Sequence, residues 1–289
     1  MRERLHATAV IARTQARELL LSPGPYAALA AGLAIGWVLC SGFARAIDSS
    51  GFDPRLDAVW DIVTRGFSGA FGPVFVERML AEGPFLLILT ASATPLLLLL
   101  LVGTVVRLGM DKASGALELI VCGPADGTSC FLGSFLKDAL LSAAGLTLIV
   151  LYCVVLAAAR NLAVGPMAVA AVPVLFLVAL SMSGIGILCS ILLSNAAGAL
   201  ALFAAVCVLF LGTLAGSLGA SVSSFRASAE AASTVIQWFS PFYYVRLCAQ
   251  GYGGGNSLEY GGGLALLAVL TATVLAAGHF ILRRRGVRA

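Results

Sequence analysis

Residues 84–106 read PFLLILTASATPLLLLLLVGTVV, an apolar run broken only by threonine and serine. About 20 consecutive apolar residues span a bilayer as a helix, because the hydrocarbon core is about 30 Å thick and each residue rises about 1.5 Å. The run lacks the alternation of apolar and polar residues that a barrel strand requires, so it predicts a helix. This stretch therefore predicts a membrane protein.

The composition of the whole chain agrees with that prediction. Of its 289 residues, 60% are hydrophobic and only 11% are charged, which argues against a soluble domain. Apolar runs predict six transmembrane helices within a single all-α domain over residues 1–289: Pro25–Ala44, Pro84–Arg107, Phe131–Ala159, Met167–Leu193, Ala196–Leu218 and Gly262–Leu282.

The distribution of charge predicts how these helices are oriented. With the N-terminus inside, eleven of the 18 Lys and Arg residues face the cytoplasm, Lys137 and Arg283 among them, and eight of the 14 acidic residues face outward. An excess of basic residues marks the cytoplasmic side. We therefore expect a multi-pass protein of the cytoplasmic membrane with both termini in the cytoplasm.

A polar loop, residues 108–130, joins the second and third predicted spans. Within it, Ala116 to Val121 can form one or two helical turns, with Gly115 suited to the entry and Gly123-Pro124 to the exit. A short helix lying across the ends of two membrane helices has the shape of a mechanical coupling element.

The residues of this loop resemble the first cytoplasmic loop of ABC-2-type permeases, the membrane subunits of ATP-binding-cassette exporters. In that pattern an acidic residue, a glycine, Leu-Glu-Leu and a proline recur in order, and the matching positions here are Asp111, Gly115, Leu117, Glu118, Leu119 and Pro124, followed by Gly133. Two positions depart from the pattern: Ala116 replaces a frequent threonine, and Ser134 replaces a frequent lysine.

The resemblance implies a transport subunit that is not itself an enzyme. A separate ATPase, which would bind ATP and Mg, would dock on residues 111–127 and on the N-terminal helix. Glu118 would then receive a cationic or hydrogen-bonding group from the ATPase, or from Arg13 or Arg17. The alternative role of Glu118 is a solvated carboxylate on a polar loop.

Residues 1–22 predict an amphipathic helix that lies in the membrane interface. Its apolar positions, Leu5, Ala9, Ala12, Ala16 and Leu19, alternate in steps of four and three, and Arg13 and Arg17 fall on a neighbouring face that can reach lipid headgroups. The resemblance implies a similar interfacial elbow helix. An ordinary basic cytoplasmic tail is the alternative.

Two glycine pairs have the spacing that lets membrane helices approach closely. Gly32 and Gly36 lie in the first predicted span, and Gly212 and Gly216 lie in the fifth. Together with the resemblance, they suggest a dimer that packs through these spans. Whether the second permease chain is identical or different is left open.

Helical segments are expected outside the membrane after spans one and five. Phe71, Phe75 and Met79 supply apolar side chains to the first of them. In the second, residues 219–261, aromatic residues are dense, as in interfacial belts. The resemblance implies instead that short helices here dip toward the membrane and form an exit gate, and the two interpretations are compatible. The residues concerned are Trp238, Pro241, Phe242, Tyr243 and Tyr244.

Several kinds of chemistry are missing from the sequence. It has no phosphate-binding loop, only two lysines and two histidines, and seven scattered cysteines, so we expect no metal site, no nucleic-acid partner and no ATP site in this chain. A disulfide between Cys40 and Cys248 is left open. The cargo is not readable, although an apolar passage suits a hydrophobic or amphipathic one.

Two other classes of function stay as alternatives. The first is a carrier or channel without an ATPase, and the expected lack of ionisable residues in the middle of the spans argues against a proton-driven one. The second is an intramembrane hydrolase, because Gly66-Phe67-Ser68-Gly69 matches the Gly-x-Ser-Gly of rhomboid proteases. His279 lies near the opposite membrane face from Ser68, which argues against a catalytic pair.

Overall fold

The computed structural model describes residues 2–48, 71, 73–114, 127–193, 195–214 and 236–285. In these ranges the regular structure is entirely helical, which confirms the all-α prediction. The helices are α1 (Arg2–Leu21), α2 (Gly24–Asp48), α4 (Pro73–Glu82), α5 (Phe85–Ala113), α7 (Gly127–Ala159), α8 (Pro166–Leu192), α9 (Ala196–Leu214), α11 (Pro241–Gly253) and α12 (Ser257–Arg285).

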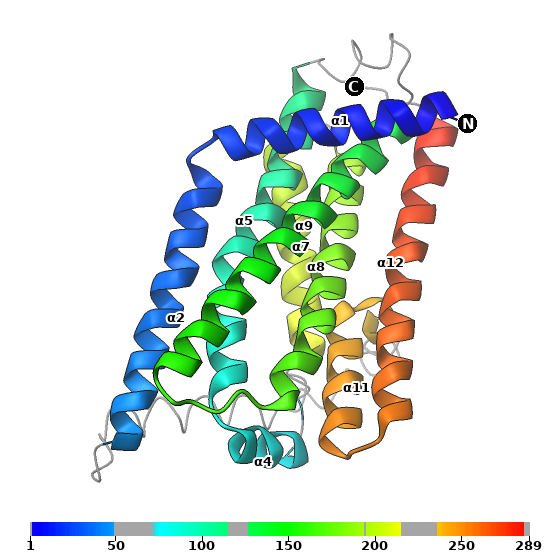
Figure 1. Ribbon diagram of the computed structural model, residues 1–289. Helices are drawn as coiled ribbons and strands as arrows, with labels where there is room; N and C mark the ends of the chain where they lie inside the picture. The colour runs from blue at the N-terminus through cyan, green and yellow to red at the C-terminus, as the bar shows by residue number, and fades with distance from the viewer. Residues whose placement is uncertain are drawn as a thin grey trace.

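Among the described residues, five helices are long and apolar enough to cross a membrane: α2, α5, α7, α8 and α12. They run side by side as a bundle (Figure 1), and they present exposed apolar side chains such as Val38, Leu98, Leu151, Val155 and Val269. Such a surface is stable against lipid and not against water. The length and composition of these five helices are therefore those of a multi-pass membrane protein.

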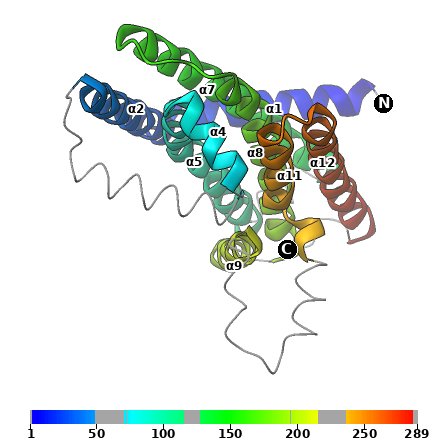
Figure 2. The ribbon, with the colours of Figure 1, turned by 90° about the horizontal axis from the view of Figure 1, so that it is seen from below.

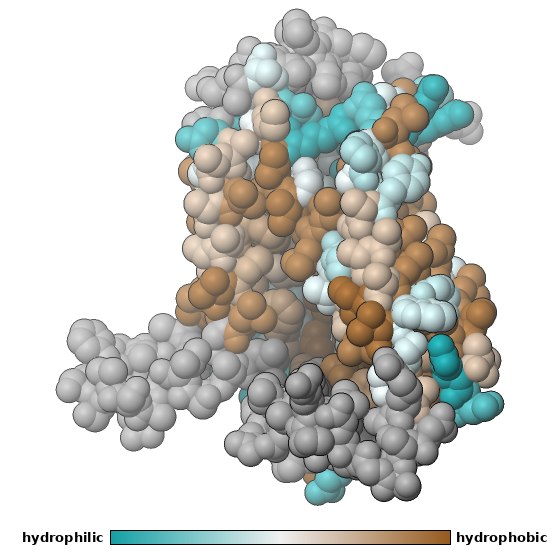
Figure 3. Space-filling view, turned by 90° about the vertical axis from the view of Figure 1, so that its left-hand side faces the viewer, coloured by the Kyte–Doolittle hydropathy of each residue, from teal (hydrophilic) through white to brown (hydrophobic). Residues whose placement is uncertain are grey.

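Helix α1 crosses one end of the bundle at a steep angle to the other helices (Figure 1). The C-terminal end of α12 lies at that same end, while α4 and α11 lie at the opposite end. At the level of α1, Figure 3 shows hydrophilic residues gathered above a largely hydrophobic wall. Below, these two ends are called the α1 end and the α4/α11 end.

Helix α5 occupies the centre of the bundle and contacts α2, α7, α8 and α9; Figure 2 shows it between α2 and α8. Two glycines of α2 allow a close approach to α5. A Cβ on Gly32 would lie 2.3 Å from the carbonyl oxygen of Ser92, and one on Gly36 would lie 2.8 Å from Ser92 Oγ.

The structure thereby corrects the predicted role of this glycine pair. Gly32 and Gly36 are buried against α5 of the same chain, so their surface is not available for packing a second copy. The prediction for the fifth span is untested, because Gly216 lies outside the described residues and nothing is described of the surroundings of Gly212.

Helices α11 and α12 form a hairpin at the α4/α11 end. Gly255, with φ of 70°, makes the turn, and the side chain of Asn256 accepts the backbone N–H groups of Leu258 and Glu259 at the start of α12. This cap extends α12 five residues beyond the predicted start at Gly262. Helix α11 runs back along α12 as a result (Figure 1).

Candidate functional site

Helix α1 docks on the first turns of α7. Ile11 sits over Gly133, where a Cβ would come within 2.8 Å of Ile11 Cγ2, and Ser134 Oγ donates a hydrogen bond of 3.0 Å to Gln15 Oε1. The buried face is rotated from the predicted one, since Thr8 is buried and Ala9 is exposed. The reason is that α7 offers a glycine and a hydroxyl, which fit an isoleucine and a glutamine.

The end of α5 is tied to α1 by an ion pair. Arg107 Nη2 contacts Glu18 Oε2, and Arg107 Nε lies 3.9 Å from Asp111 Oδ2 one turn later. These side chains are a third to a half exposed, so the pairs contribute little to stability. Their importance is positional, because the predicted coupling loop begins immediately after this turn.

A lysine ties the same turn to α8. Lys112 Nζ donates to the carbonyl oxygens of Ile191, at 3.0 Å, and Leu193, at 3.1 Å. Ile191 belongs to the last turn of α8 and Leu193 caps it, and the carbonyls at a helix end have no partner within the helix. Close packing adds to this tie, since a Cβ on Gly109 would lie 2.6 Å from Ala196 Cα in α9. The last turn of α5 is therefore held by α1, α8 and α9 together.

Of the residues predicted to couple with an ATPase, the structure describes only Asp111. Gly115, Leu117, Glu118, Leu119 and Pro124 lie outside the described residues. Arg13 and Arg17 are exposed on α1. It is Glu18 of α1, and neither of these arginines, that contacts the end of α5.

A buried ion pair lies inside the bundle, ten residues, or about 15 Å, along α7. Lys137 Nζ lies 3.0 Å from Asp138 Oδ1, and Thr104 Oγ1 of α5 donates to the same oxygen at 2.7 Å. Ser183 of α8 donates to Asp138 Oδ2. Both charged side chains are at most 3% exposed.

This cluster corrects one sequence-based expectation. Lys137 was counted among the charges at the cytoplasmic rim, but it is buried inside the bundle, about a third of the way along α7. In the sequence, only the adjacent lysine and aspartate indicated this cluster, because the hydroxyls that complete it come from other helices. Buried charges persist when they are paired and hydrogen-bonded. In the described part of the chain, no buried side-chain nitrogen or oxygen lacks a partner.

A second polar network lies at the α4/α11 end and centres on Glu82. Its Oε1 accepts from Arg78 Nε at 3.3 Å and from the Tyr252 hydroxyl at 3.3 Å, and its Oε2 accepts from the backbone N–H of Met167 at 2.7 Å. Burial, followed by the negative charge of Glu82, raises the pKa of Tyr252. The network joins α4, α8 and α11.

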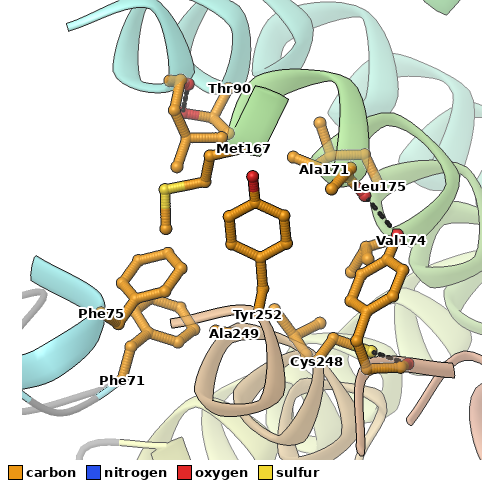
Figure 4. Close-up of a pocket in the computed structure, with 14 residues that line it drawn as sticks. Phe71, Phe75, Thr90, Met167, Ala171, Val174, Leu175, Cys248, Ala249 and Tyr252 are labelled. Carbon is orange, nitrogen blue, oxygen red and sulfur yellow. Dashed lines mark hydrogen bonds between the residues drawn. The ribbon is translucent and has the colours of Figure 1, made fainter. Parts of the chain in front are cut away.

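Next to Glu82 is a cavity of about 100 Å³, lined almost entirely by apolar atoms. Tyr252 projects into it, with Met167 and Phe75 on one side and Ala171 and Val174 on the other (Figure 4). The wall comes from α4, α5, α8, α11 and α12. No sequence motif indicated this cavity, because its residues are gathered from five separate helices.

The predicted aromatic cluster is brought together around the start of α11. Pro241 and Tyr244 are buried, the Tyr244 hydroxyl donates to the carbonyl of Trp238 at 2.8 Å, and the rings of Tyr243 and Tyr244 meet edge to face with centroids 5.5 Å apart. Trp238 and Phe242 do not line the cavity. The Trp238 side chain is 56% exposed, as suits a contact with lipid headgroups.

The described residues form no disulfide between the candidate cysteines, no catalytic pair and no cluster of metal ligands. Cys40 and Cys248 are both free thiols, so the disulfide left open by the sequence is not formed. His279 is exposed on α12, and Ser68 lies outside the described residues. The described ranges contain no group of three or more potential metal ligands.

Comparison with known proteins adds no family to this picture: protein-family models, curated proteins and solved structures yield no match to the chain.

Proposed function

We propose that this chain is the permease subunit of an ATP-driven exporter. In this proposal α9 is the sixth span, the α1 end is cytoplasmic, α1 lies in the lipid interface, and a second permease chain completes the passage. ATP and Mg are bound by a separate ATPase. A hydrophobic or amphipathic cargo suits the apolar interior.

The observation that carries the proposal is the set of ties at the end of α5. Residues 115–126 follow a helical turn that is joined to α1 through Arg107 and to α8 through Lys112. A partner that moved this loop would therefore move three helices at once. An isolated surface loop would need no such anchorage.

The test is purification of the tagged chain from its native membranes, followed by identification of co-purifying ATPases by mass spectrometry. We expect an ATP-binding-cassette ATPase, its loss when residues 111–127 are replaced by a Gly-Ser linker, and loss of transport-coupled ATP hydrolysis in Glu118→Arg. Glu259→Arg, at an exposed acidic residue near the α4/α11 end, is the matched control. A chain that transports fully without any ATPase would refute the proposal.

Orientation is tested with single cysteines at exposed positions on the two ends. Ser114 lies at the end of α5 near α1, and Ala163 lies in the α7–α8 connection at the opposite end. In intact cells, we expect a membrane-impermeant maleimide to label Ala163→Cys and to spare Ser114→Cys until the cells are opened. The reverse pattern would place the coupling loop outside and end the proposal.

One observation favours the alternative of an ATPase-independent carrier. The Lys137–Asp138 pair is buried inside the bundle, where carriers place the groups that bind protons or ions. The purified chain in liposomes separates the two functions. Uptake driven by a pH gradient alone, and lost in Asp138→Asn, would favour the carrier.

A further inference from the structure

The cavity at the α4/α11 end has an almost entirely apolar wall, and the hydroxyl hydrogens of the three hydroxyl residues that line it are all donated within the chain. The Thr90 hydroxyl donates to Leu86 O at 2.9 Å, the Tyr260 hydroxyl donates to Ala170 O at 2.7 Å, and the Tyr252 hydroxyl donates to Glu82. A buried water needs two to four polar partners. The cavity therefore selects an aliphatic occupant over water or a polar molecule.

The cavity also has the depth and position of a lipid tail. Its wall runs along α8 from Met167 to Leu175, a rise of about 12 Å. It starts at the first turns of α5, α8 and α12, beside the charged side chains of Arg78 and Glu82. In a bilayer this is the level at which headgroups meet acyl chains.

A cation stands at the rim of the cavity. The Arg78 guanidinium lies 4.8 Å from the centroid of the Tyr252 ring, and its side chain is 39% exposed. Nε and Nη1 are engaged by Glu82 and by the carbonyls of Tyr252 and Gly253. Nη2 has no partner among the described residues, and guanidinium groups bind phosphate through such donors.

From these three observations we infer that the cavity is a binding site for a resident anionic phospholipid of the bilayer. One acyl chain enters the apolar cavity, and the lipid phosphate contacts Arg78. The site does not depend on the proposed transport function, because neither ATP nor a partner chain takes part in it.

The test uses phosphatidylglycerol that carries a photoactivatable diazirine on one acyl chain, incorporated with the full chain into nanodiscs. After irradiation and digestion, mass spectrometry maps the crosslinked peptides. We expect crosslinks concentrated on α8 and α11, and a loss of about tenfold in Ala171→Leu and in Ala249→Leu, which fill the cavity. Ala265→Leu, the same substitution at an exposed position of α12, should leave the yield unchanged.

Phosphatidylcholine with the same labelled chain tests the headgroup contact. The unaltered chain should crosslink phosphatidylglycerol more strongly, Arg78→Gln should lower that yield to the phosphatidylcholine level, and Arg78→Lys should restore part of it, because lysine keeps the charge but loses the guanidinium fork. Equal yields from the two lipids in the unaltered chain would overturn the anionic assignment. Crosslinks spread evenly over the exposed faces, or unaffected by both filling variants, would overturn the site itself.

Discussion

Removing one charge of the Lys137–Asp138 pair and leaving the other should destabilise the bundle far more than removing both charges together. Lys137→Met leaves the Asp138 carboxylate buried, with only the hydroxyls of Thr104 and Ser183 to stabilise it. Asp138→Asn leaves the ammonium buried, with Thr104 Oγ1 3.0 Å away. In each single variant one uncompensated charge remains inside the bundle.

The expected magnitude follows from that count of partners. Removing one member of a buried ion pair costs about 3–5 kcal/mol, whereas hydrogen bonds between neutral groups are worth about 0.5–1.5 kcal/mol each. The double variant retains two hydroxyls, one amide and no charge. We expect it to lose only about 1–2 kcal/mol, so the two single losses should fail to add by about 3 kcal/mol or more.

The assay is equilibrium unfolding in mixed detergent micelles, followed by circular dichroism, for the unaltered chain, both single variants and the double variant. Thr147→Val is the control, because this exposed hydroxyl of α7 bonds, among the described residues, only to Ala143 O within its own helix. It should change the unfolding free energy by less than about 0.5 kcal/mol. Additive single losses, or a Lys137→Met variant as stable as the control, would refute the buried pair.

Three further outcomes test the ends of the bundle. Glu82→Gln should cost about 1–3 kcal/mol, because the backbone N–H of Met167 in the first turn of α8 and the Arg78 guanidinium lose a charged acceptor, while Glu77→Gln on the exposed side of α4 should cost little; equal losses would contradict the network. Gly133→Val should push α1 off α7, since its Cβ meets Ile11 at 2.8 Å, and trypsin should then cleave α1 faster; an unchanged cleavage rate would show that this contact does not hold α1. Burial raises the pKa of the Cys248 thiol to about 11, so at pH 8 about one thiol in a thousand is ionised, and maleimide labelling of this residue should be slow and should accelerate as the pH rises toward 11. Fast labelling of Cys248 at pH 7 would contradict that environment.

Long apolar runs made the spans predictable from the sequence, because bilayer thickness imposes a length that few other constraints imitate. The predicted start of the second span, Pro84, lies one residue from the observed start of α5. Where a capping side chain determines the end of a helix, composition predicts that end less well. Helix α12 starts in a glycine-rich stretch because Asn256 caps it, and hydropathy does not register a cap.

The partners of a residue were harder to predict than its environment. The Gly32–Gly36 spacing correctly indicated that another helix comes close, but the spacing carries no information about which helix that is. The Lys137–Asp138 pair shows the same limit. Adjacent opposite charges can neutralise each other and enter the bundle, but the hydroxyls that complete the site lie 33 and 45 residues away along the chain.

Helix α5 contributes to the cavity, to the buried ion pair and to the ties at the α1 end, and this suggests how a movement at one end reaches the other. Thr90 lines the cavity, Thr104 joins the buried pair, and Lys112 holds the end of α8. Pro95 lies between the first two and lacks the N–H that would bond back to the preceding turn, so α5 bends there more easily than elsewhere.

The contacts on the two sides of Pro95 differ in kind. Towards the α4/α11 end, α5 is packed against α2 through Ser92, and this contact fixes that half of α5 to α2. Towards the α1 end, hydrogen bonds of Asp138 unite α5 with α7 and α8. A pull on the end of α5 would therefore swing the halves of α5, α7 and α8 near the α1 end as one unit about Pro95. Because the cavity lies beyond Pro95, its lipid would stay in place during that movement.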